Sequence, residues 1–521
     1  MDFLLAFDAG TGSIRAVLFN ENGEQVCVSQ QEWTHLPDTN YPGSMNFDYV
    51  KNWNLIILCI KEVLTKAEIN PKSIKAVSAT SMREGFVLYD EKGCEIWACA
   101  NVDARAGGEV EALKRQNSEL ETINYKLSGQ TFALGAVPRL MWLKNHQPEI
   151  YKKVSAITML NDWILYKLSG VLQADPSNGC TTGLFDLTRR NWSEEITELY
   201  DIDKEIFTNV NEAGTVISHI NLEVAELTGL SEETLVVAGG GDAQLATVGV
   251  GAIEKGQAIV SGGSFWQQEL NIDKPIVDPN NRIRINCHAI QDLWQVETIA
   301  FFPGIVIKWF RDSFCDKEVE EATKIGKNFY EVMEEKTKNV PVGSYGVIPI
   351  FSDIMNFISW RHAAPSFINL SLDPEKSGKH VLFRALQENA AMVTLGNLKI
   401  IEEVTGHYPK EIIFAGGASN SKVWSQILAD MLGVPVKVPK IKEAAALGTA
   451  LYAGVGAGIF DNISDVVRKV VKFEKKYEPN MEHHQLYQEL YKTWRSVYVE
   501  QLKLADRNIT EHMWKAPGLT I

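Results

Sequence analysis

The stretch FDAGTGSIR, residues 7–15, decides the fold of this chain. Apolar runs at residues 3–6 and 16–19 flank it, which predicts a strand, a glycine-rich turn and a second strand. One glycine would satisfy a tight hairpin, but here two glycines alternate with two hydroxyl residues directly behind Asp8. Such a turn lets the backbone approach an anion, and the carboxylate can hold hydrated Mg²⁺. The stretch favours a phosphate-binding hairpin; the alternative is a tight turn closed by local Ser/Thr hydrogen bonds.

Two further glycine turns repeat this theme later in the chain. The segment QAIVSGGSFWQQEL, residues 257–270, again predicts strand, Gly/Ser turn and strand. The segment EIIFAGGASN, residues 411–420, predicts a strand that runs into a helix beginning near Lys422. Two hairpins facing each other would grip a polyphosphate from both sides. The three turns, in this order, resemble the actin/hexokinase/Hsp70-type ATPase superfamily, which implies two ribonuclease-H-like α/β domains with ATP in the cleft between them.

Length, composition and charge narrow the class of protein. At 521 residues the chain is too long for one ordinary core, and its 45% hydrophobic and 22% charged residues are typical of globular proteins. A net charge of −15 argues against nucleic acid or an anionic membrane as a partner. Seven cysteines without a Cys-x-x-Cys pair predict reduced thiols in a cytoplasmic protein. With no basic leader and no apolar run of about 18 residues, we expect neither export nor membrane insertion.

The order of predicted elements suggests a division into two domains. The strand–turn–strand theme restarts after residue 247, without a Pro- or Ser-rich linker. We therefore expect an N-terminal domain, residues 1–247, for substrate and phosphate, and a C-terminal domain, residues 248–521, for the nucleotide. The predicted elements of the first domain are strands ending at Asp8 and at 13–19, 25–30, 74–80 and 235–238, a hairpin at 87–97, a helix at 47–66, and helical stretches at about 105–170 and 193–230.

Asp242 is the candidate catalytic carboxylate. It follows three glycines, at the end of a predicted strand and the start of a predicted helix, residues 243–250. Aspartate is also a common helix N-cap, which is the alternative. A cap does not require Gly239-Gly240-Gly241, whereas glycines there let a substrate and a second backbone come close. Phosphoryl transfer to an alcohol needs a carboxylate within reach of the acceptor hydroxyl, so we interpret Asp242 as the base.

Other polar and small-residue segments suggest a pocket. Arg83 and Glu84, adjacent at the end of a predicted strand, suit a polyol; the alternative is two ordinary charged loop residues. Asp103 could line the same pocket or could cap the helix that follows it. Trp266 is a candidate for facing the cleft. The segment EAAALG, residues 443–448, predicts a helix packed close against another element.

Two common nucleotide motifs are absent from the sequence. There is no Gly-x4-Gly-Lys-Ser/Thr, which excludes a P-loop enzyme, and no Gly-x-Gly-x-x-Gly opens a helix after the first strand. A nicotinamide cofactor is therefore not expected.

Over nearly its whole length the sequence resembles the FGGY carbohydrate kinases. The turns at residues 8–13, 239–242, 261–265 and 414–417 carry this resemblance. Within the family it is most similar to kinases of 4,5-dihydroxypentane-2,3-dione. The specific stretches are residues 8–17, 42–45, 81–85, 96–106, 175–178, 362–371, 424–430 and 514–519.

The resemblance implies ATP- and Mg²⁺-dependent phosphorylation of the terminal hydroxyl of that dione, and it suggests the phosphocarrier protein HPr as a regulatory partner. It implies that Asp242 deprotonates the hydroxyl and that Asp8 and Asp242 position Mg²⁺ through water. The implied substrate residues are Arg83, Glu84, Asp103, Asp242 and Gln244. The implied nucleotide residues are Thr11, Gly12, Ser13, Arg15, Gly262, Gly263, Ser264, Gly416, Gly417 and Asn420.

The sequence departs from the family pattern at one residue, and two alternative functions remain possible at this point. Many family members have Thr where Ser264 stands, so the hydroxyl is kept but the methyl group is lost. A kinase for xylulose, ribulose or glycerol would share every nucleotide motif. A chaperone or filament protein that uses ATP as a switch would need the hairpins but not Asp242.

Overall fold

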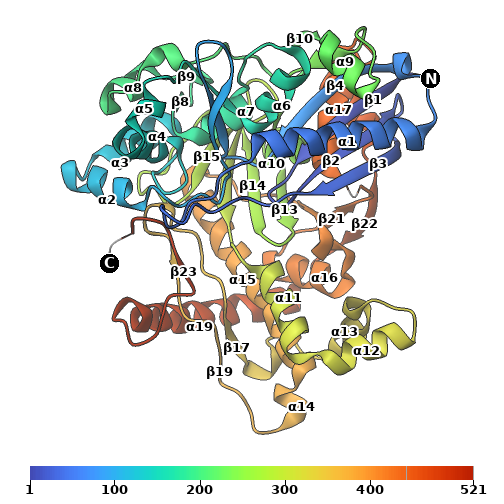
Figure 1. The fold of residues 1–521 in the computed structure, drawn as a ribbon. Helices are drawn as coiled ribbons and strands as arrows, with labels where there is room; N and C mark the ends of the chain where they lie inside the picture. The colour runs from blue at the N-terminus through green and yellow to red at the C-terminus, as the bar shows by residue number, and fades with distance from the viewer. Residues whose placement is uncertain (442, 520–521) are drawn as a thin grey trace.

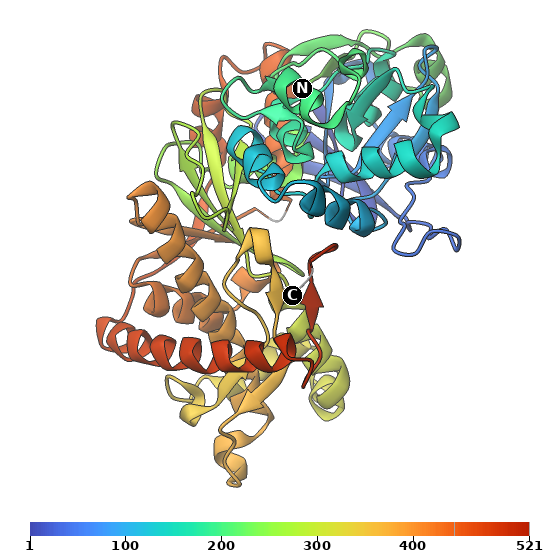
Figure 2. The same ribbon diagram turned by 90° about the vertical axis from the view of Figure 1, so that its left-hand side faces the viewer.

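Two seven-stranded sheets, one from each half of the chain, organise the structure (Figure 1). The computed structural model describes residues 1–441 and 443–519. The figures show two bodies joined along one side, the first sheet in blue and green and the second in green and orange (Figure 2). The predicted two-domain α/β architecture is confirmed.

The first sheet begins as an antiparallel meander. Strands β1 (Phe3–Ala9), β2 (Ser13–Asn20) and β3 (Gln25–Glu32) pair in sequence order, and β4 (Ile74–Ser81) lies parallel to β1. Beyond β4 the sheet continues with β11 (Leu235–Val237) and β10 (Val216–His219), and the short β12 (Gly240–Gly241) also pairs with β4. The strands predicted for this region are confirmed.

Strand β1 is buried on both faces, because its alternate side chains enter two different cores. Phe3, Leu5 and Phe7 pack in the cluster that includes helix α1 (Tyr49–Ala67). Leu4 and its like-facing neighbours pack against α17 (Ala444–Gly456) instead. Figure 1 shows α1 in front of this sheet and α17 behind it.

Helix α17 comes from the second half of the sequence but packs against the first sheet. It crosses α10 (Asp242–Gly249) so closely that a Cβ added to Gly448 would lie 2.0 Å from the carbonyl oxygen of Leu245. A Cβ on Gly249 would lie 1.9 Å from the carbonyl of Ala444. The predicted small-residue helix is thus confirmed. The division of the chain at residue 247 stays a prediction, since α17 returns to the first sheet.

The second sheet repeats the topology of the first. Strands β13 (Ala258–Gly262), β14 (Trp266–Ile272) and β16 (Trp294–Ile299) are antiparallel neighbours, and β20 (Ile412–Ala415) lies parallel to β13. Strand β15 (Arg284–Cys287) forms one edge, and β21 (Val436–Pro439) and β22 (Phe473–Tyr477) form the other.

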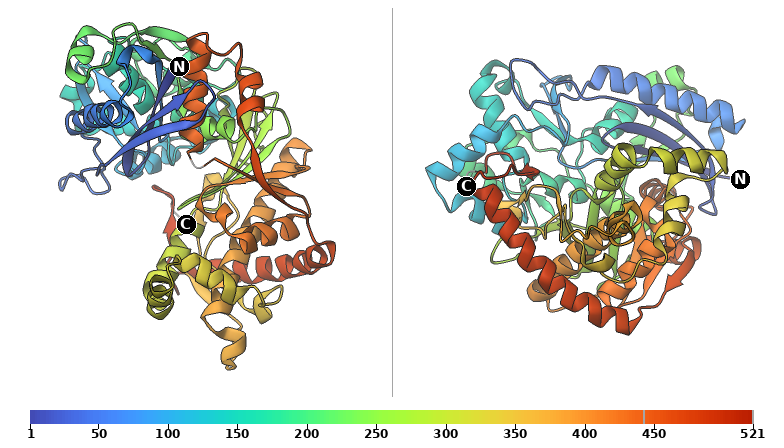
Figure 3. Two further views of the ribbon diagram at one scale, coloured as in Figure 1. Left: turned by 90° about the vertical axis from the view of Figure 1, so that its right-hand side faces the viewer. Right: turned by 90° about the horizontal axis from the view of Figure 1, so that it is seen from below.

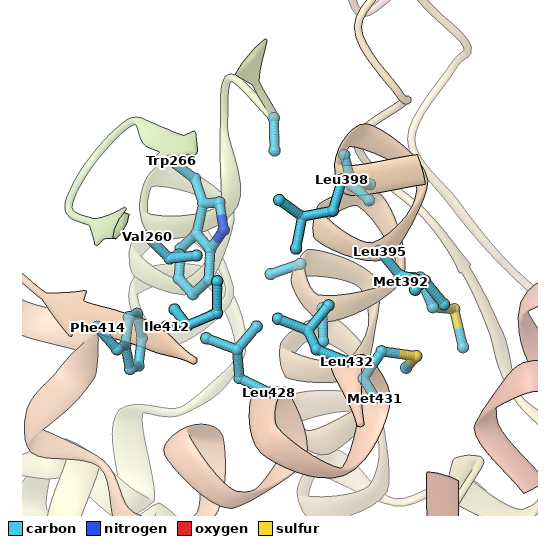
Figure 4. Packing of buried hydrophobic residues seen from close by; sticks show 14 of the residues in the cluster. Val260, Trp266, Met392, Leu395, Leu398, Ile412, Phe414, Leu428, Met431 and Leu432 are labelled. Atoms are coloured by element: carbon cyan, nitrogen blue, oxygen red, sulfur yellow. The ribbon is translucent and has the colours of Figure 1, made fainter. Parts of the chain in front are cut away.

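The core of the second domain lies between this sheet and two helices, α15 (Lys379–Thr405) and α16 (Lys422–Leu432) (Figure 4). Trp266 is fully buried there, and its indole N–H donates to Oγ1 of Thr394 at 2.9 Å. The prediction that Trp266 faces the cleft is therefore wrong, because the side chain points from β14 into the core.

Helices and short strands inserted after β4 complete the first domain. The stretch predicted as helical at 105–170 contains the strand β7 (Ala156–Met159), and the stretch at 193–230 contains β10. The other elements of the first domain are β5 (Phe86–Tyr89), β6 (Glu95–Cys99), α2 (Gly107–Gln116), α3 (Leu120–Ser128), α4 (Ala136–His146), α5 (Pro148–Tyr151), α6 (Leu160–Ser169), α7 (Pro176–Gly179), η2 (Cys180–Thr182), β8 (Phe185–Asp186), β9 (Asn191–Trp192), α8 (Glu194–Tyr200), η3 (Lys204–Ile206) and α9 (Leu222–Thr228).

The second domain carries helices outside its sheet. Figure 3 shows the long red helix α19 (Met481–Asp506) along the outside of this domain. The others are α11 (Pro303–Phe314), α12 (Asp316–Lys324), α13 (Phe329–Thr337) and α14 (Pro374–Ser377), whereas α18 (Ile463–Val470) packs beside α17 in the core of the first sheet. No helix in the described part of the chain combines the length and apolar character needed to cross a bilayer. All seven cysteines are free thiols.

The C-terminal tail bridges the two domains (Figure 2). Strand β23 (Trp514–Lys515) pairs with β18 (Arg361–His362) of the second domain. Gly518 then reaches α2 of the first domain, where its backbone nitrogen lies 3.4 Å from the Cβ position of Gly107.

Candidate active site

The geometry of the first hairpin does not by itself explain why its turn contains two glycines and two hydroxyl residues. The φ angles of Gly10 and Gly12 both lie outside the left-handed region, and a Cβ at Gly12 would meet no atom within 4 Å. Neither backbone geometry nor packing therefore requires glycine here. The hydroxyl of Thr11 accepts a hydrogen bond from Nδ2 of Asn101 at 3.0 Å, not a bond within the turn. The alternative of a turn closed by local Ser/Thr hydrogen bonds is not supported.

The side chains of Trp33 and His35 bind backbone carbonyl oxygens of this hairpin. Nε1 of Trp33 donates to the carbonyl oxygen of Gly10 at 2.9 Å, and Nε2 of His35 lies 2.7 Å from the carbonyl oxygen of Thr11. With its carbonyls held on one side, the turn leaves Gly12 exposed and Ser13 half-buried at the tip.

The second hairpin and the third glycine turn meet around one cavity of about 510 Å³. A Cβ on Gly416, which has φ +86°, would lie 2.6 Å from the carbonyl oxygen of Gly262, so the two turns touch. Of the predicted nucleotide residues, Gly262, Gly263, Ser264, Gly417 and Asn420 line this cavity. Its other walls come from α11, α13, α15 and α16. The volume is in the range of small-molecule sites.

Asp242 is the first residue of α10, and Gly241 occupies the N-cap position without a side-chain cap. The alternative reading of Asp242 as an N-cap is therefore wrong. Its side chain is 38% exposed, and its Oδ1 accepts from the backbone N–H of Ala243 at 2.7 Å. Each preceding glycine is crowded: a Cβ on Gly239 would lie 1.9 Å from the carbonyl oxygen of Ala79. The three glycines thus allow the close approach that brings Asp242 to the site.

The electrostatics of Asp242 suit a proton acceptor. Desolvation raises the pKa of Asp242 to about 6, although Arg83 pulls it down. Nε of Arg83 lies 3.7 Å from Oδ1 of Asp242. A carboxylate with this pKa is ionised at neutral pH and is more basic than an ordinary aspartate.

Arg83 and Glu84 join the two domains through buried ion pairs. Arg83 binds both carboxylate oxygens of Glu297 on β16, and Nη2 of Arg284 on β15 lies 2.7 Å from Glu84. Burial alone would raise the pKa of Glu297, but the two arginines outweigh it and lower the pKa below its ordinary value. Arg83 and Glu84 therefore do not pair with each other, as predicted from their adjacent positions.

Glu84 adopts a backbone conformation that is rare for its residue type. Its φ is +63°, in the left-handed region. Strain of this kind persists where the surroundings determine the conformation, and it gathers at functional sites. The side chain of Glu84 is thereby presented to Arg284, so the two charges that were read alternatively as loop residues belong to one interdomain network.

The carboxylate of Asp8 lies at the end of β1 near two other acids. Nη1 of Arg15, its cross-strand partner, is 3.8 Å from Asp8 and 2.9 Å from Glu443. Desolvation, Asp242 and Glu443 raise the pKa of Asp8 to about 7, against the opposing effect of Arg15. Carboxylate oxygens are ligands that Mg²⁺ prefers, and a cation would relieve the repulsion between Asp8 and Asp242, so these two residues fit the predicted metal.

Two predicted substrate residues are enclosed by protein. The carboxylate of Asp103 accepts from Nε of Arg105 at 2.8 Å and from the backbone N–H of Met45 at 2.6 Å, so its role in this structure is to hold its loop. The alternative of Asp103 as the cap of the following helix is wrong, because Ala106 occupies the N-cap position of α2. A contact of Asp103 with substrate stays a prediction. Gln244 is fully buried, and neither of its side-chain polar atoms has a hydrogen-bond partner among the described residues.

Sequence reasoning missed Arg284, Glu297 and Glu443. The first two lie on strands whose polar residues alternate with apolar ones, a pattern that ordinarily indicates a solvent-exposed face. No local signal shows that this face is buried against the other domain. Glu443 was noted only as the start of a small-residue helix, and its approach to Asp8 depends on α17 returning to the first sheet.

The fold and the site together define a two-domain enzyme of the actin/hexokinase type. The xylulose kinase of Lactobacillus acidophilus superposes with a TM-score of 0.84 at 19% identity, over 97% of this chain and 99% of that one. The glycerol kinase of Plasmodium falciparum, solved with ADP, superposes with a TM-score of 0.83 at 18% identity, over 96% and 98%. At these identities the likeness shows the fold alone.

Family comparison is more specific. Residues 3–249 match the N-terminal domain and residues 270–457 the C-terminal domain of the FGGY family of carbohydrate kinases. The chain belongs to this family. It is 50% identical over 519 residues to the autoinducer-2 kinases of Yersinia enterocolitica and Yersinia pseudotuberculosis, covering 99% of this chain and 98% of each relative.

Proposed function

We propose that this protein transfers the γ-phosphoryl group of ATP to the terminal hydroxyl of 4,5-dihydroxypentane-2,3-dione, the open-chain form of autoinducer-2. The observation that carries this proposal is 50% identity over 519 residues, nearly the full length, to curated autoinducer-2 kinases. The likeness in fold to xylulose and glycerol kinases, below 25% identity, supports a kinase but does not select its acceptor.

In this proposal Asp242 accepts the proton of the acceptor hydroxyl while the hydroxyl oxygen bonds to the γ-phosphorus and ADP departs. Its raised pKa, about 6, and its position at the N-terminus of α10 support this role. Arg83, 3.7 Å from Asp242 and fixed by Glu297, orients the acceptor beside the base. Such positioning supplies much of the rate enhancement in phosphoryl transfer, where the protein makes little covalent chemistry.

The nucleotide is assigned to the second domain with its phosphates toward the first. Adenosine would occupy the 510 Å³ cavity, and Gly263 and Ser264 on its rim would face the β- and γ-phosphates. Thr11, Gly12 and Ser13 would contact the same phosphates from the other side. Mg²⁺, held through water by Asp8 and Asp242, would neutralise charge on the phosphates.

The product would be a charged form of a small neutral signal. A phosphorylated dione cannot cross a membrane by diffusion, which fits a cytoplasmic enzyme that retains a quorum-sensing signal inside the cell. The family resemblance also makes the phosphocarrier protein HPr a regulatory partner to be tested, by calorimetric titration of HPr into the kinase.

An ADP-release assay with Mg·ATP tests the function directly. The acceptors are dihydroxypentanedione, xylulose, ribulose and glycerol, and the Asp242→Asn variant measures background ATP hydrolysis. We expect the highest kcat/KM for the dione. A preference for a sugar or glycerol would keep the kinase and overturn the proposed substrate. ATP turnover independent of every acceptor would favour the ATP-switch alternative.

A further inference from the structure

The polar face of strands β14, β15 and β16 contains one acid that the ion-pair network does not use. Glu269, Glu297 and Arg284 stand opposite one another in a row across the three strands. Arg284 and Arg83 both bind Glu297, and Arg284 also binds Glu84. These four residues balance one another's charge, which leaves Glu269 without a cation of its own.

Helix α10 covers this polar face from the first domain. Nε2 of Gln295 on β16 donates to Oγ1 of Thr247 on α10 at 2.7 Å. Gln244 lies one turn before Thr247 on the same side of the helix, toward Asp242. A Cβ added to Gly241 would lie 2.5 Å from Oε1 of Gln244 and 3.3 Å from Cγ of Arg83. Gln244 therefore borders the place where Arg83 meets the β16 row.

Glu269 and Gln244 share an unusual property. Glu269 is 1% exposed and Gln244 is 0% exposed. Within residues 1–441 and 443–519, neither carboxylate oxygen of Glu269 and neither amide atom of Gln244 has a hydrogen-bond partner. Buried polar side chains nearly always have partners. Glu269 lies opposite the partner of Arg83, and Gln244 lies on the helix that begins at Asp242, so their lack of partners indicates a place for a ligand.

The chemistry of this pair suits an uncharged ligand. Burial raises the pKa of Glu269 well above its usual range, and the neighbouring Glu297 raises it further. A protonated carboxyl group offers one O–H donor and acceptor oxygens, and the amide of Gln244 offers two N–H donors and an acceptor oxygen. Hydroxyl and carbonyl oxygens of a small neutral acceptor match these groups without introducing a buried charge.

We propose that Glu269 binds an oxygen atom of the phosphoryl acceptor, together with Gln244, which the family resemblance already implies as a substrate residue, and that Glu269 helps to select a small, uncharged hydroxyketone or polyol. The inference rests on the proposed kinase function and deepens it, because it names the groups that recognise the part of the acceptor away from the reacting hydroxyl.

Glu269→Leu is the main test, since leucine has a similar volume and no polar atom. We expect the acceptor KM to rise about tenfold, the value for one lost hydrogen bond to a buried partner, while the KM for ATP stays unchanged. The Tm should be equal or higher, because an unpaired buried polar group is removed. Glu269→Gln keeps a donor and an acceptor and should recover most of the lost affinity. An acceptor KM within twofold of wild type in folded Glu269→Leu would overturn the proposal.

Ser352→Ala is the matched control. Oγ of Ser352 is also buried without a partner among the described residues, but it lies in the loop after β17 (Ile348–Ile350), in the second domain. Its acceptor KM should not change. If Glu269→Leu fails to fold, Gln244→Leu is titrated calorimetrically with acceptor and a non-hydrolysable ATP analogue. About tenfold weaker acceptor binding supports the inference, and unchanged binding overturns it.

The wild-type acceptor panel separates this inference from the proposed function. If the wild type prefers a sugar, the dione is excluded as the substrate, and the Glu269 variants are then measured with that sugar. A tenfold rise in its KM would still support the inference, whereas an unchanged KM would overturn it independently.

Discussion

Asp242 holds its carboxylate at the start of α10 with one oxygen bound to the backbone and the other side open. We expect Asp242→Asn to lower kcat by about 10²- to 10⁴-fold, because an amide cannot accept the hydroxyl proton. The asparagine oxygen can still accept from Ala243, so the fold and ATP binding should persist. Steady-state kinetics and ATP titration check this. A variant that keeps more than a tenth of wild-type kcat would contradict the role of Asp242 as the base.

A substitution at Gly12 can distinguish an effect on ATP binding from an effect on the stability of the fold. A Cβ there meets no protein atom within 4 Å, so Gly12→Ala should leave the free energy of unfolding unchanged or raise it by about 0.4–1 kcal/mol. If phosphate approaches this backbone, the added methyl group should raise the KM for ATP severalfold. Thermal unfolding and ATP kinetics measure the two effects. An unchanged KM would remove Gly12 from the phosphate site.

Single residues show where sequence reasoning reaches its limit. The sequence indicates Asp242, Arg83 and Glu84 because these charged residues follow the end of a predicted strand and have glycines nearby. Their partners Glu297 and Arg284 look like ordinary polar positions of amphipathic strands. Only the packing of the two domains shows that these charges are buried, and no local pattern contains that information.

Among the elements, the crossing of α10 and α17 is set by two glycines. Gly448→Ala would place its Cβ 2.0 Å from the carbonyl oxygen of Leu245, so the helices must separate. We expect a loss of about 1–3 kcal/mol in the free energy of unfolding. Because α10 begins at Asp242, kcat should fall as well.

Gly108→Ala provides the control for this substitution. Gly108 lies in α2, where a Cβ would meet nothing within 4 Å, so alanine should stabilise the protein by up to about 1 kcal/mol. Urea unfolding of both variants makes the comparison. If Gly448→Ala were as stable as wild type, the close crossing would be wrong.

Strands that follow an apolar run bounded by turn residues were predicted, and strands that lie between helices were not. The meander β1–β3 and the strands β4 and β11 follow apolar runs bounded by turn residues. Strands β7 and β10 have four residues each and lie between helices, so their apolar residues also fit a helical period. The place of α17 depends on contacts with strands β1 and β4, which lie more than 350 residues away along the chain.

For the whole molecule, the division of the site between domains predicts closure. The cavity of 510 Å³ belongs to the second domain and Asp242 to the first. We expect ATP analogue and acceptor together to reduce the radius of gyration, because closure excludes water from the reactive phosphate. Small-angle scattering with each ligand alone and with both measures this. No compaction with both ligands would contradict a closing mechanism.

Two buried histidines should make global stability depend on pH. Burial lowers the pKa of His288 and of His362 to about 3. Their unfolded pKa is about 6.5, so the unfolded chain binds more protons between these values. Stability is therefore full above pH 6.5 and is lost as the pH falls toward 3, by about 2 kcal/mol for each histidine at pH 5.

Thermal unfolding between pH 7.5 and 5 measures this loss. Nδ1 of His362 accepts from the backbone N–H of Asp353 at 3.1 Å. His362→Asn keeps an acceptor there but cannot take up a proton, so its stability should fall less steeply with pH than that of the wild type. Identical slopes would show that His362 does not contribute.

The tail that runs from β23 to α2 has a practical consequence for anyone who handles this enzyme. Gly518 lies against Gly107 and Val110 of α2, so a polypeptide fused after this tail would begin close to the junction of the two domains. We expect an affinity tag or a fluorescent protein placed there to hinder the predicted closure of the two domains. Met1 is 75% exposed, which makes the opposite terminus the safer point of attachment.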